Sequence, residues 1–519
     1  MKRFALVFSV GLFAVPAIAA DPAQLSAKID QYIDAGYKAN GVTPAPLADD
    51  AEFLRRVYLD LAGRIPQVAD VRTFLADKNP NKRRLLVQDL LGRSGYVQHF
   101  GNLWRREWLP QTVSNPQFQF LGTQFEPWIR DQLRNNTPYD KIVREILIVP
   151  PAGMNQFGGQ GFDSSANAKT AFLQVNEMKP ENVASAASRL FLGVKLECAQ
   201  CHDHPFETYS RVQFWEFASF FAGLQPIDPR GRRAPAEAIE IRALTIPGTQ
   251  TKVAAKFLDG KMPEFKEKIS PRVTLADWMT APNNPYFARN AVNRMWANFF
   301  GTGLIDPLDE PGEKNPASHP ELLDAMAKDF AASGYDMKYL IGAIAGSRAY
   351  QLSSAAPGAS ATNDRTFSRM RVRGLTPEQL FDSLAVATYF GDAQNPRQFT
   401  GMSQARSEFL GKFATTERLS ETQTSILQAL TLMNGRLVGD LTSVHRSNLL
   451  SSVIEAPFFD TAQRIEALFL ATVTRNPRAD ELKKLSAYVD KAGSSEDSKK
   501  ALADVFWALL NSSEFAFNH

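Results

Sequence analysis

The sequence contains very little cysteine. Only two occur among 519 residues, at Cys198 and Cys201, and His202 follows directly. Two cysteines cannot build the network of disulfides that stabilises small secreted proteins. The chain has another source of stability, because 44% of its residues are hydrophobic and its length suffices for two or three domains. The scarcity indicates that this pair is reserved for chemistry.

Long apolar runs and an excess of one charge are also missing. Beyond the N-terminal segment, no stretch approaches the eighteen or so uninterrupted apolar residues that a membrane-spanning helix needs. Without Lys2 and Arg3, 56 basic residues face 55 acidic ones. We therefore expect no membrane span in the mature chain, and no binding of nucleic acid or an anionic membrane through net charge.

The N-terminus is typical of a secretory signal peptide. Lys2 and Arg3 give a positive start, residues 4–15 form a short apolar run, and Ala17-Ile18-Ala19 is a small-x-small cleavage site. We predict that residues 1–20 are removed and that the mature protein is periplasmic or secreted. No cysteine follows the cleavage site, so a lipid anchor is not expected.

The run Cys198-Ala199-Gln200-Cys201-His202 has the CxxCH pattern of covalent haem attachment. In such sites the two thiols add across the vinyl groups, and the histidine ligates the iron. Export agrees with this interpretation, because haem attachment takes place outside the cytoplasm. The pattern predicts a covalent haem c with His202 as the proximal ligand.

Two other chemistries fit the same residues. In an oxidising compartment the cysteines can close into a disulfide or serve redox exchange. Together with His202 and His204 they also offer two thiolates and two imidazoles to zinc, although structural zinc normally draws its ligands from two separated pairs. His204 could instead bond a haem propionate or hold the loop, so its role stays open.

The surroundings of the motif leave further alternatives. Met178 and His319 are candidates for a distal iron ligand, and Lys195, Arg189 and Arg211 are candidate partners of the propionates. The aromatic segment 206–221 could wall a haem or form ordinary helical core. The acids of the run 308–313 could bind calcium or belong to a loop between helices.

Hydrophobic periodicity predicts a mainly α-helical fold with two multi-helix domains, residues 21–225 and 271–519. The predicted helices are 23–39, 50–62, 82–91, 96–108, 127–135, 139–148, 180–192, 288–300, 319–333, 337–347, 377–390, 424–434, 461–473, 479–492 and 498–511. Candidate strands at 237–246 and 252–258 predict a small β insertion over residues 226–270.

One internal similarity joins the two ends of the chain. Residues 57–66 and residues 468–477 each run from an apolar stretch to an arginine and a proline. A duplicated helical unit and a chance likeness of helix-start patterns both explain it.

Several motifs resemble a planctomycete-type cytochrome-c-like family in which a PSCyt and a PSD domain, both of unknown function, are paired. The motifs are RRVYLDLAGRIP at 55–66, FLGVKLECAQCHDHPF at 191–206, VNRMW at 292–296, SHPELLD at 318–324 and WALLNSSEF at 507–515. The resemblance implies a secreted, mostly helical protein with a haem-binding site and an exported partner protein. Many relatives carry a histidine where this chain has Asn298 and Phe299. If that histidine serves a haem in them, this chain has lost the role.

These observations leave three functions. The first is an exported monohaem c-type cytochrome-like protein that transfers single electrons to or from a periplasmic redox partner. The second is a haem-dependent oxidoreductase acting on an unidentified substrate, which could be a carbohydrate. The third is a secreted scaffold with a zinc or thiol site. No hydrolytic motif such as GxSxG or HExxH is present, so the sequence names no catalytic residue.

Overall fold

The computed structural model describes residues 21–150, 164–203, 208–225, 236–312, 314–355, 364–390, 405–411, 436–444 and 446–519. Within these residues the fold is mainly α-helical with small two-stranded sheets, as predicted. The predicted signal peptide, His204 and the predicted helix 424–434 lie outside the described residues.

From Pro22 to Phe221, a range that includes the CxxCH motif, all the described elements are helices. They are α1 (Pro22–Asn40), α2 (Asp50–Ala62), α3 (Val68–Ala76), α4 (Lys82–Gly92), α5 (Ser94–Trp108), α6 (Gln111–Ser114), η1 (Pro116–Phe118), α7 (Gln119–Arg134), α8 (Tyr139–Ile148), α9 (Ser164–Val175), α10 (Pro180–Ala187), η3 (Ser188–Leu192), η4 (Glu197–Gln200), α11 (Arg211–Ala218) and η5 (Ser219–Phe221).

Short strands follow, and then helices return. The elements are β1 (Leu224–Gln225), β2 (Ala236–Glu237), β3 (Ala243–Thr245), β4 (Lys252–Ala254), α12 (Pro271–Met279), α13 (Phe287–Phe300), α14 (Pro320–Ala332), α15 (Met337–Gly346), η6 (Asp364–Thr366), β5 (Arg373–Gly374), α16 (Pro377–Thr388), α19 (Arg436–Thr442), α20 (Asn448–Glu455), α21 (Thr461–Thr472), α22 (Ala479–Asp490), α23 (Ser495–Leu510), α24 (Ser513–Ala516) and β6 (Phe517–Asn518).

The sheets are three antiparallel pairs, β1 with β2, β3 with β4, and β5 with β6. The hairpin of β3 and β4 lies in the predicted β insertion, and its strands are shorter than predicted. The pairing of β5 with β6 places Arg373 opposite Asn518, which ties the C-terminal end of the chain to residues some 145 positions earlier.

One predicted helix is wrong at its start. Residues 127–135 were expected to begin a helix at Pro127, but α7 begins at Gln119 and carries the proline inside. A proline inside a helix removes one backbone hydrogen bond. The buried face formed by Leu121, Phe125 and Trp128 continues across it, and this burial outweighs the lost bond.

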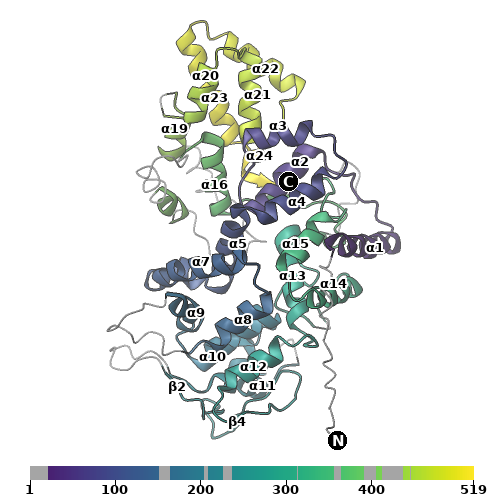
Figure 1. Ribbon diagram of the computed structural model, residues 1–519, viewed down its shortest axis with the longest axis vertical. Coiled ribbons are helices and arrows are strands. Elements are labelled where there is room, and N and C mark those ends of the chain that lie inside the picture. The colour runs from purple at the N-terminus through teal and green to yellow at the C-terminus, as the bar shows by residue number, and fades with distance from the viewer. Residues whose placement is uncertain are drawn as a thin grey trace, which may run out of the picture.

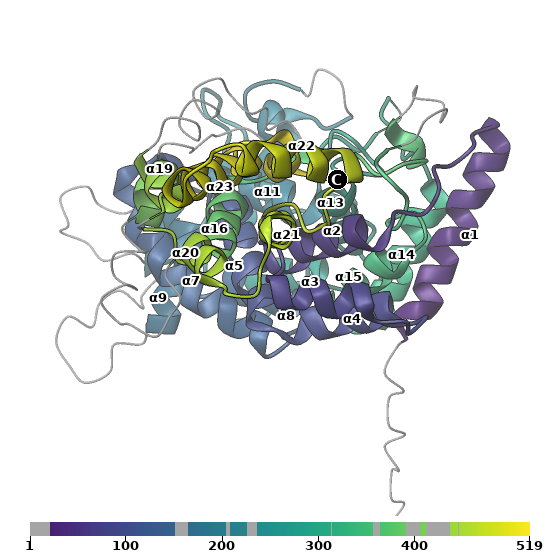
Figure 2. The same ribbon diagram turned by 90° about the horizontal axis from the view of Figure 1, so that it is seen from above.

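The described residues form two hydrophobic cores. The main core extends from Leu25 to Tyr350, with a few later residues, and the second core takes most of its members from residues 375–515. The main core therefore joins residues on both sides of the β insertion. Helix α1 packs along α14 and α15 on one flank of the molecule (Figure 2). Figure 1 shows α19 to α23 at one end of the molecule, and α8 and α10 to α12 at the other.

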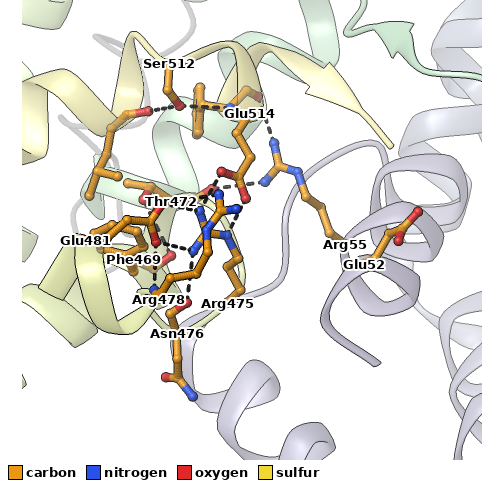
Figure 3. Close-up of polar contacts among 12 residues, drawn as sticks. Glu52, Arg55, Phe469, Thr472, Arg475, Asn476, Arg478, Glu481, Ser512 and Glu514 are labelled. Carbon is orange, nitrogen blue, oxygen red and sulfur yellow. Dashed lines mark hydrogen bonds and ion pairs between the residues drawn. The ribbon is translucent and has the colours of Figure 1, made fainter. Parts of the chain in front are cut away.

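Helix α2 lies where the two cores meet. Val57 faces the main core and Leu59 the second one, and every residue from 53 to 61 is buried. A helix buried on all sides must satisfy its polar side chains internally. Arg55 does so at its two terminal nitrogens, which donate to the carbonyls of Thr472, at 3.0 Å, and Phe515, at 2.8 Å. Figure 3 shows this arginine reaching from α2 toward the C-terminal segment.

The segments that resemble each other in sequence also fold alike. Asp49 caps α2 and Asp460 caps α21, each by accepting a hydrogen bond from the third residue of its helix. Both helices are followed by a residue with positive φ, Gly63 at 68° and Thr474 at 63°, and a proline comes three residues later. Each then leads into the next helix, α3 or α22, and α3 contacts α21.

Candidate functional site

A helix, a π-helical turn and a short extended stretch deliver the CxxCH motif. The predicted helix 180–192 is present as α10 followed by η3, which is π-helical. Such π turns are frequent at functional sites. Gly193 ends the turn with φ of 70°, in the left-handed region that favours glycine. A short 3₁₀ helix, η4, then carries Cys198.

Gly193 also allows close packing against α13. A Cβ atom at this position would lie 2.6 Å from Oδ1 of Asn290. Asn290 in turn donates from Nδ2 to the carbonyl of Leu190 at 2.8 Å. One hydrogen bond therefore fixes the end of η3 to α13, and the lack of a side chain at Gly193 allows the two to approach closely.

The stretch before the motif is fixed by the acids of the run 308–313. The backbone N–H of Lys195 donates to the carbonyl of Asp309 at 2.9 Å, and the Lys195 ammonium lies 2.9 Å from Glu310. The hydrogen bond to Glu310 raises the pKa of Lys195. Arg294 of α13 pairs with Asp309 and donates to the carbonyl of Arg189 at 2.8 Å. Asp309 and Glu310 thus belong to a loop that holds the motif segment.

Both cysteines are free, and their surroundings differ. Cys198 is half-buried, whereas Cys201 is exposed. Between them, Ala199 is buried, and the carbonyl of Gln200 accepts hydrogen bonds from Trp215 Nε1 at 3.1 Å and Arg211 Nε at 3.3 Å. The backbone of the motif is therefore anchored in the protein while the second thiol stays open to solvent.

His202 is exposed and held in one tautomer. Its Nδ1 lies 2.7 Å from the carbonyl of Asp203. A carbonyl can only accept, so Nδ1 carries a proton, and in the neutral imidazole Nε2 then holds the free lone pair. Metal-ligating histidines commonly donate their other ring N–H in this way. The Asp203 side chain accepts a hydrogen bond from the backbone N–H of Arg211 at 2.8 Å. This bond holds Asp203, and with it the carbonyl that accepts from His202, in place.

The structure does not gather the described candidate ligands into one metal site. Among the described residues, no group of three or more His, Cys, Asp and Glu side chains could hold a metal ion. The side chains of the motif therefore do not converge on one point, although Cys198, Cys201 and His202 are close in sequence. The fourth predicted donor, His204, lies outside the described residues.

The aromatic segment after the motif is part of the main core. Phe214, Phe217 and Phe221 are fully or almost fully buried. Phe220 stacks on Phe257 with ring centroids 5.0 Å apart. The β insertion therefore covers this segment, which favours the core interpretation over an open haem wall.

The other predicted partners have structural roles in the described residues. Met178 is buried in the main core. His319 packs against Phe367 at 5.7 Å, and burial lowers its pKa. Arg189 lies 3.6 Å from Glu197, and Arg211 donates to the carbonyl of Pro247 at 2.6 Å.

Sequence reasoning missed a charged pocket of about 340 Å³ at the junction of α5, α6, α7, α16 and residues 405–411. Arg106 donates to Glu378 at 3.0 Å, and Arg105 lies 2.7 Å from Glu126. Burial would raise the pKa of Glu378, but the charges of Arg106 and Arg105 lower it overall. No local pattern signals this pocket, because its walls come from residues about 270 positions apart.

Sequence reasoning also missed a small, partly open cavity beside the motif segment. Glu107 of α5, Tyr139 of α8, and Arg294 and Asn298 of α13 line it. Asn298 is one of the two positions where relatives were expected to carry histidine. The other, Phe299, is fully buried and packs edge-on against Tyr350 with centroids 5.6 Å apart.

Two family models match the chain. The PSCyt2 model, described as a protein of unknown function (DUF1549), matches residues 28–226. The PSD1 model, described as a protein of unknown function (DUF1553), matches residues 271–408 and 406–489. No curated protein and no solved structure matches the chain. In the described residues, every helix is too short or too polar to cross a membrane.

Proposed function

We propose that this chain, which belongs to the family with paired PSCyt and PSD domains, is an exported monohaem c-type cytochrome-like protein. In this role it transfers single electrons to or from a periplasmic redox partner. The observation that carries the proposal is the CxxCH motif with free thiols and a histidine whose Nε2 lone pair is available.

The described residues fit the group that the motif implies. Cys198 and Cys201 would hold a haem through thioether bonds, and Nε2 of His202 would bind the iron. The bound haem would supply a one-electron redox couple. The protein contributes the fixed tautomer of His202 and the backbone anchors at Gln200, which orient the donors before any ligand is bound.

Two features favour haem over the alternatives. A tetrahedral zinc site needs its donors to converge, and the three described donors of the motif form no such group. Both thiols are free in this structure, so both are available for thioether bonds. The exposed side of the motif, with Cys201 and His202, would be the surface where a partner approaches.

A pyridine haemochrome spectrum of the exported protein tests the proposal. The wild-type protein is expected to show covalent haem that survives denaturation. Cys198→Ala and Cys201→Ala should each reduce the retained haem, and His202→Ala should keep covalent haem but change its spectrum. Gln200→Ala is the matched control, because it changes a spacer residue of the motif and removes no donor. Equal haem in both cysteine variants and the wild type would contradict attachment through thioethers.

The charged pocket supports a second candidate, a haem-dependent oxidoreductase. Pockets of this size at the junction of two chain segments commonly bind small molecules. Arg105, Arg106 and Glu378 would recognise a polar substrate. Thermal shift with D-galactose and D-galacturonate tests this. Binding lost in Glu378→Gln, with the haem spectrum unchanged, would favour the enzyme over a simple electron carrier.

A further inference from the structure

The small cavity beside the motif segment has a volume of about 20 Å³, which is enough for a water molecule. Trp104 and Trp108, which stack with centroids 5.0 Å apart, form part of its apolar wall. Its polar lining comes from three helices that are distant in sequence, α5, α8 and α13. The cavity is therefore created by tertiary packing.

Three of the polar side chains that line the cavity have no hydrogen-bond or ion-pair partner among the described residues. The Glu107 carboxyl, the Asn298 side-chain amide and the Tyr139 hydroxyl form no hydrogen bond or ion pair with another described residue. Nε of Arg294 is buried and is also without a hydrogen bond. Of these four groups, Arg294 Nε is the one that is both buried and unbonded. Such an atom costs about 1–3 kcal/mol, and a water molecule in the cavity would offset that cost and bond the neighbouring carboxyl and amide.

We propose that this cavity is a hydrated proton-binding site, in which Glu107 takes up a proton from solvent and an ordered water molecule bonds Glu107 and Asn298. The protonated carboxyl then donates one hydrogen bond and accepts another, and the water supplies the remaining partners. This proposal does not depend on haem attachment.

Several charges act on Glu107 from the elements packed around it. Burial is the largest influence and raises the pKa of its carboxyl. Arg294 of α13 and Arg106 of α5 oppose this rise, whereas Asp309 adds to it. Arg294 is already paired with Asp309, which reduces its effect as a counterion for Glu107. Tyr139 of α8 has its own pKa raised by burial and by Glu107.

The position of the site links it to the motif segment. Arg294 lines the cavity and also donates to the carbonyl of Arg189, in the turn that precedes the motif. Asp309, the ion-pair partner of Arg294, accepts from the backbone of Lys195. A proton on Glu107 therefore changes the charge next to the residues that position Cys198.

Infrared spectroscopy during a pH titration tests whether the Glu107 carboxyl takes up a proton. The wild-type spectrum should contain a carboxyl C=O band with a midpoint above the ordinary glutamate pKa of about 4.3, and the band should be absent from Glu107→Gln. Each unit of that rise corresponds to about a tenfold higher proton affinity. Glu264→Gln, at an exposed site, is the control and should keep the band. A wild-type midpoint at or below the ordinary value would overturn the proposal.

Stability measurements and crystallography supply independent readouts. The folded pKa of Glu107 is raised, so the wild-type protein loses stability as pH rises from the unfolded value through the folded one. The unfolding free energy of Glu107→Gln relative to wild type should therefore increase over that range, while Glu264→Gln stays flat. A high-resolution crystal structure should show a water bonded to Glu107 and Asn298. The proposal would be contradicted if the difference in unfolding free energy between Glu107→Gln and wild type did not change with pH. A crystal structure with no water molecule in the cavity would also contradict it.

Discussion

Arg373 of β5 donates two hydrogen bonds to Asp60 of α2, at 2.8 and 3.0 Å. Asp60 is almost fully buried and also accepts from Tyr350 Oη at 2.7 Å and Asn518 Nδ2 at 2.8 Å. This carboxylate, which belongs to the RRVYLDLAGRIP motif, thus joins α2 to three distant parts of the chain. These four hydrogen bonds give Asp60 a structural role in holding the chain segments together.

Asp60→Ala should strongly destabilise the protein. The change leaves the partly buried Arg373 guanidinium without its carboxylate partner and removes the buried acceptor of Tyr350 and Asn518. Breaking a buried ion pair in this way costs about 3–5 kcal/mol, and the partial exposure of Arg373 places the expected loss at the lower end of that range. Urea unfolding measures the loss, and Asp480→Ala at an exposed position is the control. A loss below about 1 kcal/mol would show that Asp60 does not hold α2 in place.

Gly193→Ala should disturb the motif segment more than an ordinary glycine substitution. The new Cβ meets Asn290 at 2.6 Å, and the backbone has a positive φ. Gly248→Ala is a matched control, because its φ is 74° but nothing lies within 4 Å of its Cβ. The control measures left-handed strain alone, about 1 kcal/mol. We expect Gly193→Ala to cost about 1–3 kcal/mol more, by overpacking against α13. Equal losses would contradict the close approach to Asn290.

His99 should make stability fall in mild acid. Burial lowers the pKa of its imidazole from 6.5 to about 4. The unfolded chain therefore binds more protons between these values, and the stability from neutral His99 is lost as pH falls from about 6.5 to 4. His99→Gln should remove that slope, worth up to about 3 kcal/mol. An unchanged pH profile of the unfolding free energy would contradict this prediction.

Glu481 should make the free energy of unfolding depend on pH in a more acidic range than His99 does. Hydrogen bonding from Arg475 lowers the pKa of its carboxyl from 4.5 to about 2, and Arg475 also bonds Glu514 (Figure 3). A lowered carboxyl pKa stabilises the fold above the unfolded value, and this stability is lost as pH falls toward 2. Glu481→Gln should flatten the unfolding free energy between pH 4.5 and 2, and exposed Glu496→Gln should not.

Local signals in the sequence predicted much of the fold. The bounds of α2 are as predicted, because Asp49 caps its start and Gly63 ends it. The α7 boundary failed because Pro127 indicates a helix start, and only tertiary burial carries the helix across it. Pairings such as β5 with β6 depend on contacts between distant segments that no local pattern encodes.

The candidate site was predictable only in part. The identity of Cys198, Cys201 and His202 follows from spacing alone, whereas the tautomer of His202 depends on the backbone carbonyl of Asp203. The cavity around Glu107 could not be predicted, because Glu107 and Asn298 are almost 200 positions apart and only the tertiary fold brings α5 and α13 to the same cavity.

The central claim is that the two sulfurs of the motif are bonded to a haem. The intact mass of the protein, exported by cells that mature c-type cytochromes, tests it most directly. The account predicts a mass equal to the polypeptide without residues 1–20 plus one haem, and Cys198→Ala/Cys201→Ala should lack that addition. A wild-type mass equal to the processed polypeptide alone would contradict the account.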